Sequence, residues 1–397
     1  MSDYLDHLDQ GLLIDIFSRL PVETLARLTF VCKSWRSFIT SPDFIYHPLI
    51  RNALTRNAND RRLLLVGYRT YVPKQDPSCL TDRYHKTDHY SLMVDGSDSF
   101  RQLKAFHLPF DSLGNSIVGI VNGVICLSGD FKRGYTDDMF LWNPSFRTMF
   151  LWNPSIRKCV ALPKYDAMAG QIRPFLGFGF DPVTNDFKVV RIHTHKKTLV
   201  ELYTHKTRCW RNISEKALPA MIVEHCQAYV NGASYWVAAT QVTALGNFRF
   251  RYTILSFDMS AEVFKEILIP ESVSSVSDED RFKLKLVVFK ESLHLIQEFL
   301  NNEDPHCAVW IMKEYSVSTS WSRLFRIDLS GVLRSPLALR ENGEVIFETH
   351  DGKLVSCDHQ SRHITYLGIR GTDTDSGYFH SHRFYVETYT ESLELLN

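Results

Sequence analysis

The side chains best suited to chemistry are histidines that occur in two short pairs. The pairs are His-Thr-His at 193–195 and His-Ser-His at 380–382, and a spacing of two residues places both rings on one side of a strand. Two histidines could begin a zinc site, but zinc needs further ligands that converge on them. The sequence has no spaced set of cysteines and histidines to supply these ligands. We therefore predict surface histidines and no metal site.

Other stretches contain residue types found in active sites without the pattern that chemistry needs. Gly177-Phe178-Gly179 lacks the third glycine and the helix that phosphate binding requires. The stretches at 224–226 and 278–280 are typical of a loop and of a solvated acidic segment. No G-x-S-x-G turn of a serine hydrolase occurs. We predict a chain that binds no cofactor and has no catalysis of its own.

Composition narrows the class of protein further. The 397 residues contain 45 Lys plus Arg and 45 Asp plus Glu, and this balance argues against a nucleic-acid binder or a membrane-surface binder, which would need a basic excess. The N-terminal stretch is acidic and polar, unlike a secretory signal, and no apolar run reaches the 18 or more residues of a membrane span. The eight cysteines are scattered without a C-x-x-C motif, which is typical of reduced core residues.

Residues 8–39 predict three short amphipathic helices. Apolar residues between 8 and 20 recur at helical spacing. Pro21 ends this helix and could serve as the first residue of the next one. A second helix carries an apolar face within 22–28, and a third runs through 32–39. A unit of this size cannot bury all these stripes in one core, so part of the apolar surface is expected to bind a partner.

The same stretch resembles an F-box, the motif that docks on the Skp adaptor of Skp–cullin–F-box (SCF) ubiquitin ligases. Arg-Leu-Pro at 19–21 and Cys-Lys-Ser-Trp at 32–35 carry the resemblance. One departure is that Asp9 and Gln10 follow Leu8 where the family pattern begins Leu-Pro, which is expected to weaken one edge of the adaptor contact. The resemblance implies that the adaptor-binding residues are Leu8, Leu12, Leu13, Ile16, Phe17, Leu20, Pro21, Val22, Leu25 and Trp35.

Beyond the helices, apolar residues recur with the period of two that is typical of strands. Pairs of strands joined by tight turns repeat along this region. Their turn residues, Asn153, Thr204, Asp258, Glu314 and Asp358, are 51, 54, 56 and 44 residues apart. A period near 50 is typical of kelch-type propellers. Each such pair, joined to the hairpin before it, gives four antiparallel strands, which make one propeller blade.

This pattern predicts a β-propeller of about six four-stranded blades. One blade is composite, because strands at 63–71, 90–95 and 102–108 need a fourth from 383–388, which would close the ring and remove its edges. In another blade, MFLWNPSFRT (139–148) is followed at once by MFLWNPSIRK. We predict that the second copy belongs to the blade and that the first is extruded as a loop or forms an extra edge strand. The five complete blades are predicted at 116–163, 175–213, 226–270, 282–328 and 335–369.

The propeller region also resembles a known family. FLWNPSIRKCVALP, GFGFDPVTNDFKVVRI and VWIMKEYSVSTSWSRLFRI resemble the plant F-box-associated interaction domain. Together with the F-box, the resemblance covers nearly the whole chain. It implies a substrate-recognition subunit of an SCF ubiquitin ligase in the cytoplasm, the nucleus or both, bound to a Skp adaptor and through it to a cullin. The expected boundaries are an F-box at 1–45, a helical connector and linker at 46–62, the propeller-like domain at 63–390 and a C-terminal tail at 391–397.

Loop lengths predict where a protein substrate would bind. Short turns such as Asn122-Gly123, Asn231-Gly232 and Asn342-Gly343 share one face of the propeller, and longer connections such as 163–174 and 239–251 share the other. Long loops on a rigid scaffold are common recognition sites. The chain enters the propeller on the short-turn side, so we expect the long-loop face to point away from the adaptor.

Two alternatives stay open. One is a propeller enzyme or small-molecule receptor with a pocket in the central channel. It would need convergent His, Asp or Glu on the innermost strands, which are predicted to be almost entirely apolar or small. The other is a propeller-type binding module that does not join the ligase because of the altered start at Leu8-Asp9.

Overall fold

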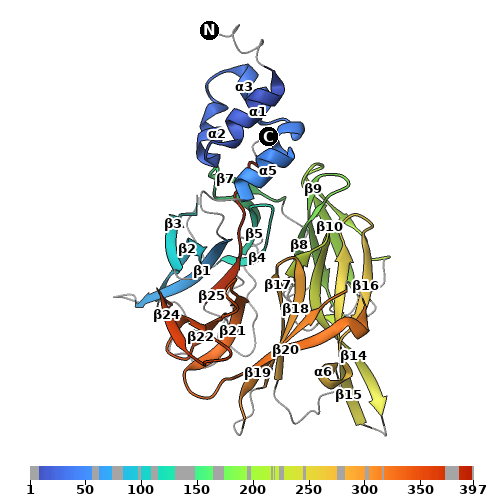
Figure 1. The fold of residues 1–397 in the computed structure, drawn as a ribbon. Coiled ribbons are helices and arrows are strands. Elements are labelled where there is room, and N and C mark those ends of the chain that lie inside the picture. The colour runs from blue at the N-terminus through green and yellow to red at the C-terminus, as the bar shows by residue number, and fades with distance from the viewer. Residues whose placement is uncertain are drawn as a thin grey trace.

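The protein consists of a small helical unit seated on one face of a six-bladed β-propeller (Figure 1). This is a computed structural model. It describes residues 9–55, 62–73, 84–96, 100–108, 115–129, 148–163, 174–194, 198–215, 218, 220–222, 228–244, 247–274, 282–299, 304–314, 317–371 and 384–395.

The helical unit forms as its sequence predicts. Pro21 precedes the second helix as its N-cap rather than serving as its first residue. Ser41 caps the fourth helix, where its hydroxyl accepts a hydrogen bond of 3.2 Å from the Phe44 amide. None of the helices in the described ranges combines the length and the apolarity of a membrane-crossing segment. The helices are α1 (Gln10–Ser18), α2 (Val22–Leu28), α3 (Lys33–Ile39), α4 (Pro42–Ile45) and α5 (Pro48–Thr55).

The first blade confirms the predicted closure of the ring. Its strands are β1 (Arg62–Pro73), β2 (Tyr84–Asp95), β3 (Phe100–Phe106) and β25 (Phe384–Thr388), in the order β25-β1-β2-β3. Antiparallel pairing runs from Leu64 opposite Thr388 to Tyr68 opposite Phe384. The two ends of the propeller sequence therefore share one sheet, and the ring has no free edge at its seam.

The other blades follow one another along the chain. The second contains β4 (Asn115–Val121), β5 (Val124–Gly129), β6 (Met149–Asn153) and β7 (Lys158–Ala161). The third contains β8 (Phe175–Asp181), β9 (Asp186–His193), β10 (Leu199–Thr204) and β11 (Cys209–Asn212). The fourth contains β12 (Met221–Ile222), β13 (Ala228–Val230), β14 (Ala233–Ala244), β15 (Asn247–Asp258) and β16 (Val263–Leu268), followed by α6 (Glu271–Ser274).

The fifth blade contains β17 (Phe282–Phe289), β18 (Ser292–Phe299), β19 (His306–Met312) and β20 (Trp321–Asp328), with the short 3-10 helix η2 (Ser318–Ser320) before β20. The sixth contains β21 (Leu333–Leu339), β22 (Val345–Thr349), β23 (Lys353–Cys357) and β24 (Ile364–Arg370).

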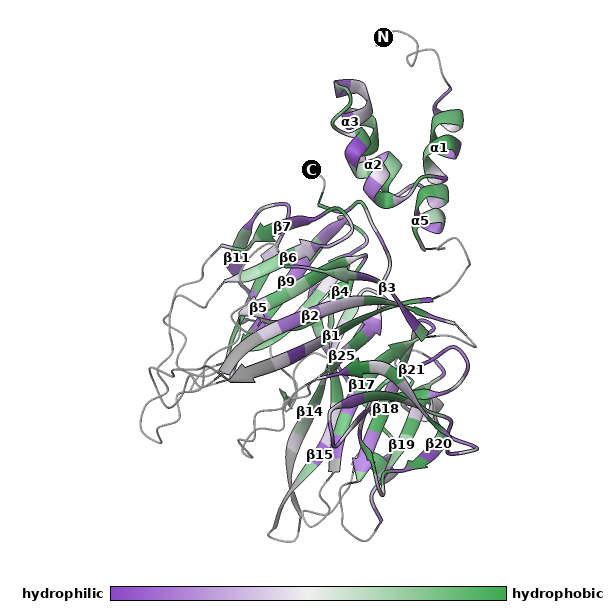
Figure 2. Cartoon of the chain, turned by 90° about the vertical axis from the view of Figure 1, so that its left-hand side faces the viewer, coloured by the Kyte–Doolittle hydropathy of each residue, from purple (hydrophilic) through white to green (hydrophobic). Residues whose placement is uncertain are grey.

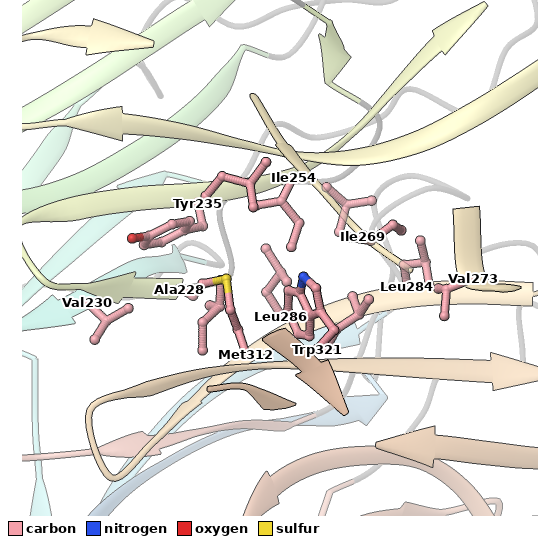
Figure 3. Packing of buried hydrophobic residues seen from close by; sticks show 14 of the residues in the cluster. Ala228, Val230, Tyr235, Ile254, Ile269, Val273, Leu284, Leu286, Met312 and Trp321 are labelled. Carbon is pink, nitrogen blue, oxygen red and sulfur yellow. The ribbon is translucent and has the colours of Figure 1, made fainter. Parts of the chain in front are cut away.

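The propeller core is a set of six apolar clusters, one between each pair of neighbouring blades. Figure 3 shows the cluster between the fourth and fifth blades, where Tyr235 and Ile254 face Leu286, Met312 and Trp321. Each blade thus buries both of its faces against its neighbours, so the strands carry apolar side chains on both sides. Stability of the ring depends on how well adjacent blades fit together.

The turns agree with the sequence in part. Asn122-Gly123 and Asn231-Gly232 adopt positive φ at both residues, as two-residue hairpin turns favour. Asn342-Gly343 differs, because only Gly343 has a positive φ and the turn spans Arg340 to Glu344. Lys290 and Glu291 adopt positive φ values of 47° and 58°, which is unusual for residues with side chains.

The structure tests two further predictions from the sequence. The long loop predicted at 239–251 is wrong, because β14 and β15 continue as one long hairpin up to Ala244 and from Asn247. In the ten-residue duplication, the second copy forms β6, the turn after it and the start of β7, as predicted. The part of the first copy at 139–147 lies outside the described residues.

Candidate functional site

The helical unit has an apolar core of its own, which decides which predicted adaptor residues can reach a partner. Phe17, Val22 and Leu25 are at most 4% exposed and pack with residues of α3, α4 and α5. The Phe17 ring lies edge-on to Trp35 at 5.6 Å and to Phe44 at 6.0 Å between ring centroids. These three side chains hold the helices together and can support a binding surface only from beneath.

Other predicted residues do lie on the surface. Leu12 and Ile16, four residues apart on α1, are 47% and 43% exposed, so they lie one above the other on one side of the helix. Pro21 is exposed, and Leu13 and Leu20 are half-buried. Leu8 lies outside the described residues. The surface expected from the sequence is thus centred on Leu12 and Ile16.

The turn between α2 and α3 adds two exposed apolar side chains. Phe30 is 87% exposed and Val31 is 63% exposed. Phe30 was not among the predicted site residues. It comes after the last apolar residue of the α2 stripe and does not continue the helical spacing of that stripe, so the periodic pattern did not indicate it. Apolar side chains exposed to this degree on a small helical unit are typical of a binding surface.

Trp35 supports this surface from the start of α3. The side chain of Cys32 caps α3 by accepting a hydrogen bond of 3.4 Å from the Trp35 amide. The Trp35 indole is half-buried against Phe17, and its Nε1 has no hydrogen-bond partner among the described residues. Trp35 therefore fixes the angle between α1 and α3 mainly by apolar packing.

The helical unit sits on the short-turn face of the propeller. The Tyr46 and Phe180 rings lie 6.2 Å apart, and Ile156 in the turn between β6 and β7 packs against the helical core. Lys104 of β3 forms an ion pair with Glu23 of α2. Burial raises the pKa of Glu23, but the hydrogen bond from Lys104, a backbone hydrogen bond and the charges of Lys104 and Arg27 together hold that pKa below its ordinary value. Figure 2 shows the helices above one end of the sheets.

Ionisable groups inside the propeller are mostly paired with one another. Lys188 Nζ lies 2.8 Å from Asp181 Oδ2, 2.7 Å from the Met259 carbonyl and 3.0 Å from Glu262 Oε1, which ties the third blade to the fourth. Arg340 donates to Asp95 at 2.8 Å and so ties the sixth blade to the first. These interactions lie between blades, where they position neighbouring sheets.

The innermost strands are less uniformly apolar than predicted. Lys285 of β17 donates to the Pro336 carbonyl at 3.2 Å, and β25 carries Glu387. Burial lowers the pKa of Lys285 and raises that of Glu387 to about 7. Within the described part of the chain, no group of three or more His, Cys, Asp or Glu side chains is arranged to hold a metal ion.

The histidine pairs differ from their prediction at one position. His193 is buried rather than on the surface, at 7% exposure. Burial, together with nearby Arg191, lowers its pKa to about 4, so the ring is neutral at physiological pH. The second histidine of its pair, at position 195, and the pair at 380–382 lie outside the described residues.

Comparison with known proteins agrees with this architecture. Residues 5–47 match the model of the F-box domain, and residues 79–375 match that of the F-box associated beta propeller domain. An F-box/kelch-repeat protein of Arabidopsis thaliana is 24% identical, over 88% of this chain and 87% of its own. F-box protein CPR1 of the same plant is 26% identical, over 92% of this chain and 84% of its own. The chain belongs to the F-box proteins that carry an F-box-associated β-propeller domain.

Proposed function

We propose that this protein is the substrate-recognition subunit of an SCF E3 ubiquitin ligase, acting in the cytoplasm, the nucleus or both. In this role the helical unit docks on a Skp adaptor and through it joins a cullin, while the propeller captures a target protein for ubiquitination. The protein itself contributes binding and no bond-making step. The observation that carries the proposal is that the apolar side chains of Leu12, Ile16, Phe30 and Val31 stay exposed on helices whose other apolar side chains pack in a core.

The position of the helical unit supports a division of labour between the two propeller faces. The helices cover the short-turn face, around Ile156 and Phe180. The strand ends next to 74–83 and 164–173 lie on the opposite face, and those two segments are outside the described residues. A target bound on that opposite face would not compete with the adaptor for space. We therefore assign target capture to the long-loop face.

The adaptor contact can be tested with a pull-down of the purified chain against a purified Skp adaptor. The double variant Leu12→Asp/Ile16→Asp should abolish binding, because burying an ionised carboxylate in an apolar contact is costly. Leu324→Asp on β20 is the matched control, because Leu324 is also 47% exposed but lies on the propeller. The sequence also predicts a long loop at 72–89, of which 72–73 and 84–89 lie in β1 and β2. Alanine blocks in the remaining segment 74–83 or in 163–174 should lose the target and keep the adaptor.

The outcome also separates the second candidate function. The first helix begins after Asp9, whose side chain makes no capping hydrogen bond, at the point where the family pattern has Leu-Pro. If the wild-type chain binds no adaptor, the protein is a binding module or small-molecule receptor that acts outside the ligase. If the double variant binds as well as the Leu324→Asp control, the surface assigned here is wrong.

A further inference from the structure

Residues 389–395, which follow the ring-closing strand β25, lie between the helical unit and the propeller. This stretch, here called the C-terminal clasp, includes most of the segment that the sequence suggested as a tail. Three of its side chains are buried in three different clusters. Tyr389 (2% exposed) packs between the first and second blades, Leu393 (1%) in the core of the helices, and Leu395 (6%) between the second and third blades.

The propeller holds the backbone of the clasp through one buried amide. Asn153 is 0% exposed, and its Nδ2 lies 3.0 Å from the Ser392 carbonyl, 3.1 Å from Ser392 Oγ and 3.0 Å from the Glu394 carbonyl. Its Oδ1 accepts a hydrogen bond of 3.0 Å from the Ser155 amide, which fixes the side chain in its turn. Asn153 is thus oriented by its own blade and engaged by the clasp.

The turn at Asn122-Gly123 has the shape that the clasp requires. A Cβ atom on Gly123 would lie 2.7 Å from Ser392 Oγ and closer still to the Thr390 carbonyl. The Tyr389 hydroxyl lies 3.3 Å from the Gly123 carbonyl and 2.8 Å from Ser155 Oγ. The absence of a Cβ on Gly123 therefore allows both the positive φ of its hairpin and the close approach of the clasp.

The helices bind the clasp from the other side. Leu393 packs with Phe17 and Ile45 in the helical core, so this core is completed by a residue from the far end of the chain. The Tyr46 hydroxyl donates to Glu394 Oε2 at 3.3 Å. Within the described residues, the helices also meet the propeller through the Glu23–Lys104 pair and the packing of Tyr46 and Ile156 described above. The clasp is the one described segment with buried side chains in both bodies.

We propose that the C-terminal clasp fixes the orientation of the adaptor-binding helices on the propeller and thereby sets the position of a captured target relative to the rest of the ligase. The structural half of this proposal stands on the contacts above, and its consequence for ubiquitination rests on the proposed function. Flexible attachment would spread a bound target over many positions. Ubiquitin transfer needs the target near a fixed point, so orientation is a positioning function distinct from binding.

The test measures the distance between spin labels by double electron–electron resonance on the full chain. Labels at Ser37→Cys on α3 and Glu266→Cys on β16 are placed in a background whose reactive native cysteines are replaced by serine. The wild type should give a single narrow distance. Deletion of 391–397 should replace it with a broad distribution while the adaptor pull-down is retained.

A second variant releases the clasp without removing Leu393 from the helical core. Asn153→Asp keeps the acceptor for the Ser155 amide but turns a carboxylate oxygen toward the Ser392 and Glu394 carbonyls, so it should also broaden the distance. Leu12→Asp/Ile16→Asp serves as the reciprocal control, because it should lose the adaptor and keep the narrow distance. Narrow distances in both clasp variants would overturn the proposal, whatever the adaptor result; loss of adaptor binding by the wild type would overturn only the proposed function.

Discussion

The close packing of the third and fourth blades predicts an unequal effect of two glycine-to-alanine substitutions. A Cβ on Gly177 would lie 2.9 Å from Cη2 of Trp236 and closer still to Cζ2, well inside the ordinary separation of about 3.5–4.0 Å. Trp236 is 0% exposed, and its Nε1 donates to the Leu176 carbonyl at 3.1 Å. The ring must move and strain that bond, so Gly177→Ala should lower the free energy of unfolding by about 2–4 kcal/mol.

Gly119→Ala is the matched control, since Gly119 lies on the innermost strand β4 of the neighbouring blade. The nearest side-chain atom to its added Cβ is Phe178 Cβ at 3.7 Å, an ordinary contact, so the change should stay within about 0.5 kcal/mol of zero or stabilise slightly. Urea denaturation followed by far-UV circular dichroism measures both. A double variant with Trp236→Leu should cost less than the sum of its parts by about 1 kcal/mol or more. Equal effects of the two alanines, or strict additivity, would refute the reasoning.

Two further predictions concern a turn and a buried carboxyl. Lys290 and Glu291 both have positive φ, and this conformation costs a residue with a side chain about 1 kcal/mol. Glu291→Gly removes that cost and should therefore raise the urea midpoint of unfolding. An unchanged or lower midpoint would count against this reasoning. Burial raises the pKa of Glu394 to about 7 from its ordinary 4.5. Its protonated form is favoured by folding, so this stability is complete below pH 4.5 and is lost as the pH rises through 7. From pH 6 to 8 the free energy of unfolding should fall by about 1.3 kcal/mol for this carboxyl, and Glu394→Gln should remove that part of the slope; an identical slope in the variant would contradict it.

The propeller was predictable because its information is local and repeated. A period of two, tight turns and a spacing near 50 residues fix four strands to a blade, and the blade count then demands a strand from 384–388 to close the ring. What the sequence could not supply was the length of a hairpin such as β14–β15. The extension of β15 alternates apolar and polar residues from Phe248 to Arg251, but the extension of β14 at 240–244 is mostly polar or small and shows no such pattern.

The sequence predicted which helices form the candidate site, but not which of their side chains are exposed. Helical spacing put Phe17 and Ile16 in one stripe, yet Phe17 is buried and Ile16 is 43% exposed. An apolar stripe of this width faces both the helical core and the exposed surface, and only the packing of α3 to α5 decides which of its residues are buried. The stretch Gly177-Phe178-Gly179 was rejected as a phosphate-binding loop, and the structure explains its glycines by packing. The two glycines leave room for Trp236 and Tyr229 of the next blade.

The C-terminal clasp could not be predicted from its spacing. Tyr389, Leu393 and Leu395 are separated by four and two residues, which would place all three on one face of a strand. The clasp forms neither helix nor strand, and each of these side chains enters a different cluster. The strand β25, which pairs with β1, ends at Thr388 immediately before the clasp begins. Because the clasp follows β25 directly, the pairing of β25 with β1 places the clasp beside Asn153 and Gly123 and leads Leu393 into the helical core. Weakening the β1–β25 seam should accordingly loosen the helices as well as the propeller, although the two lie in different domains.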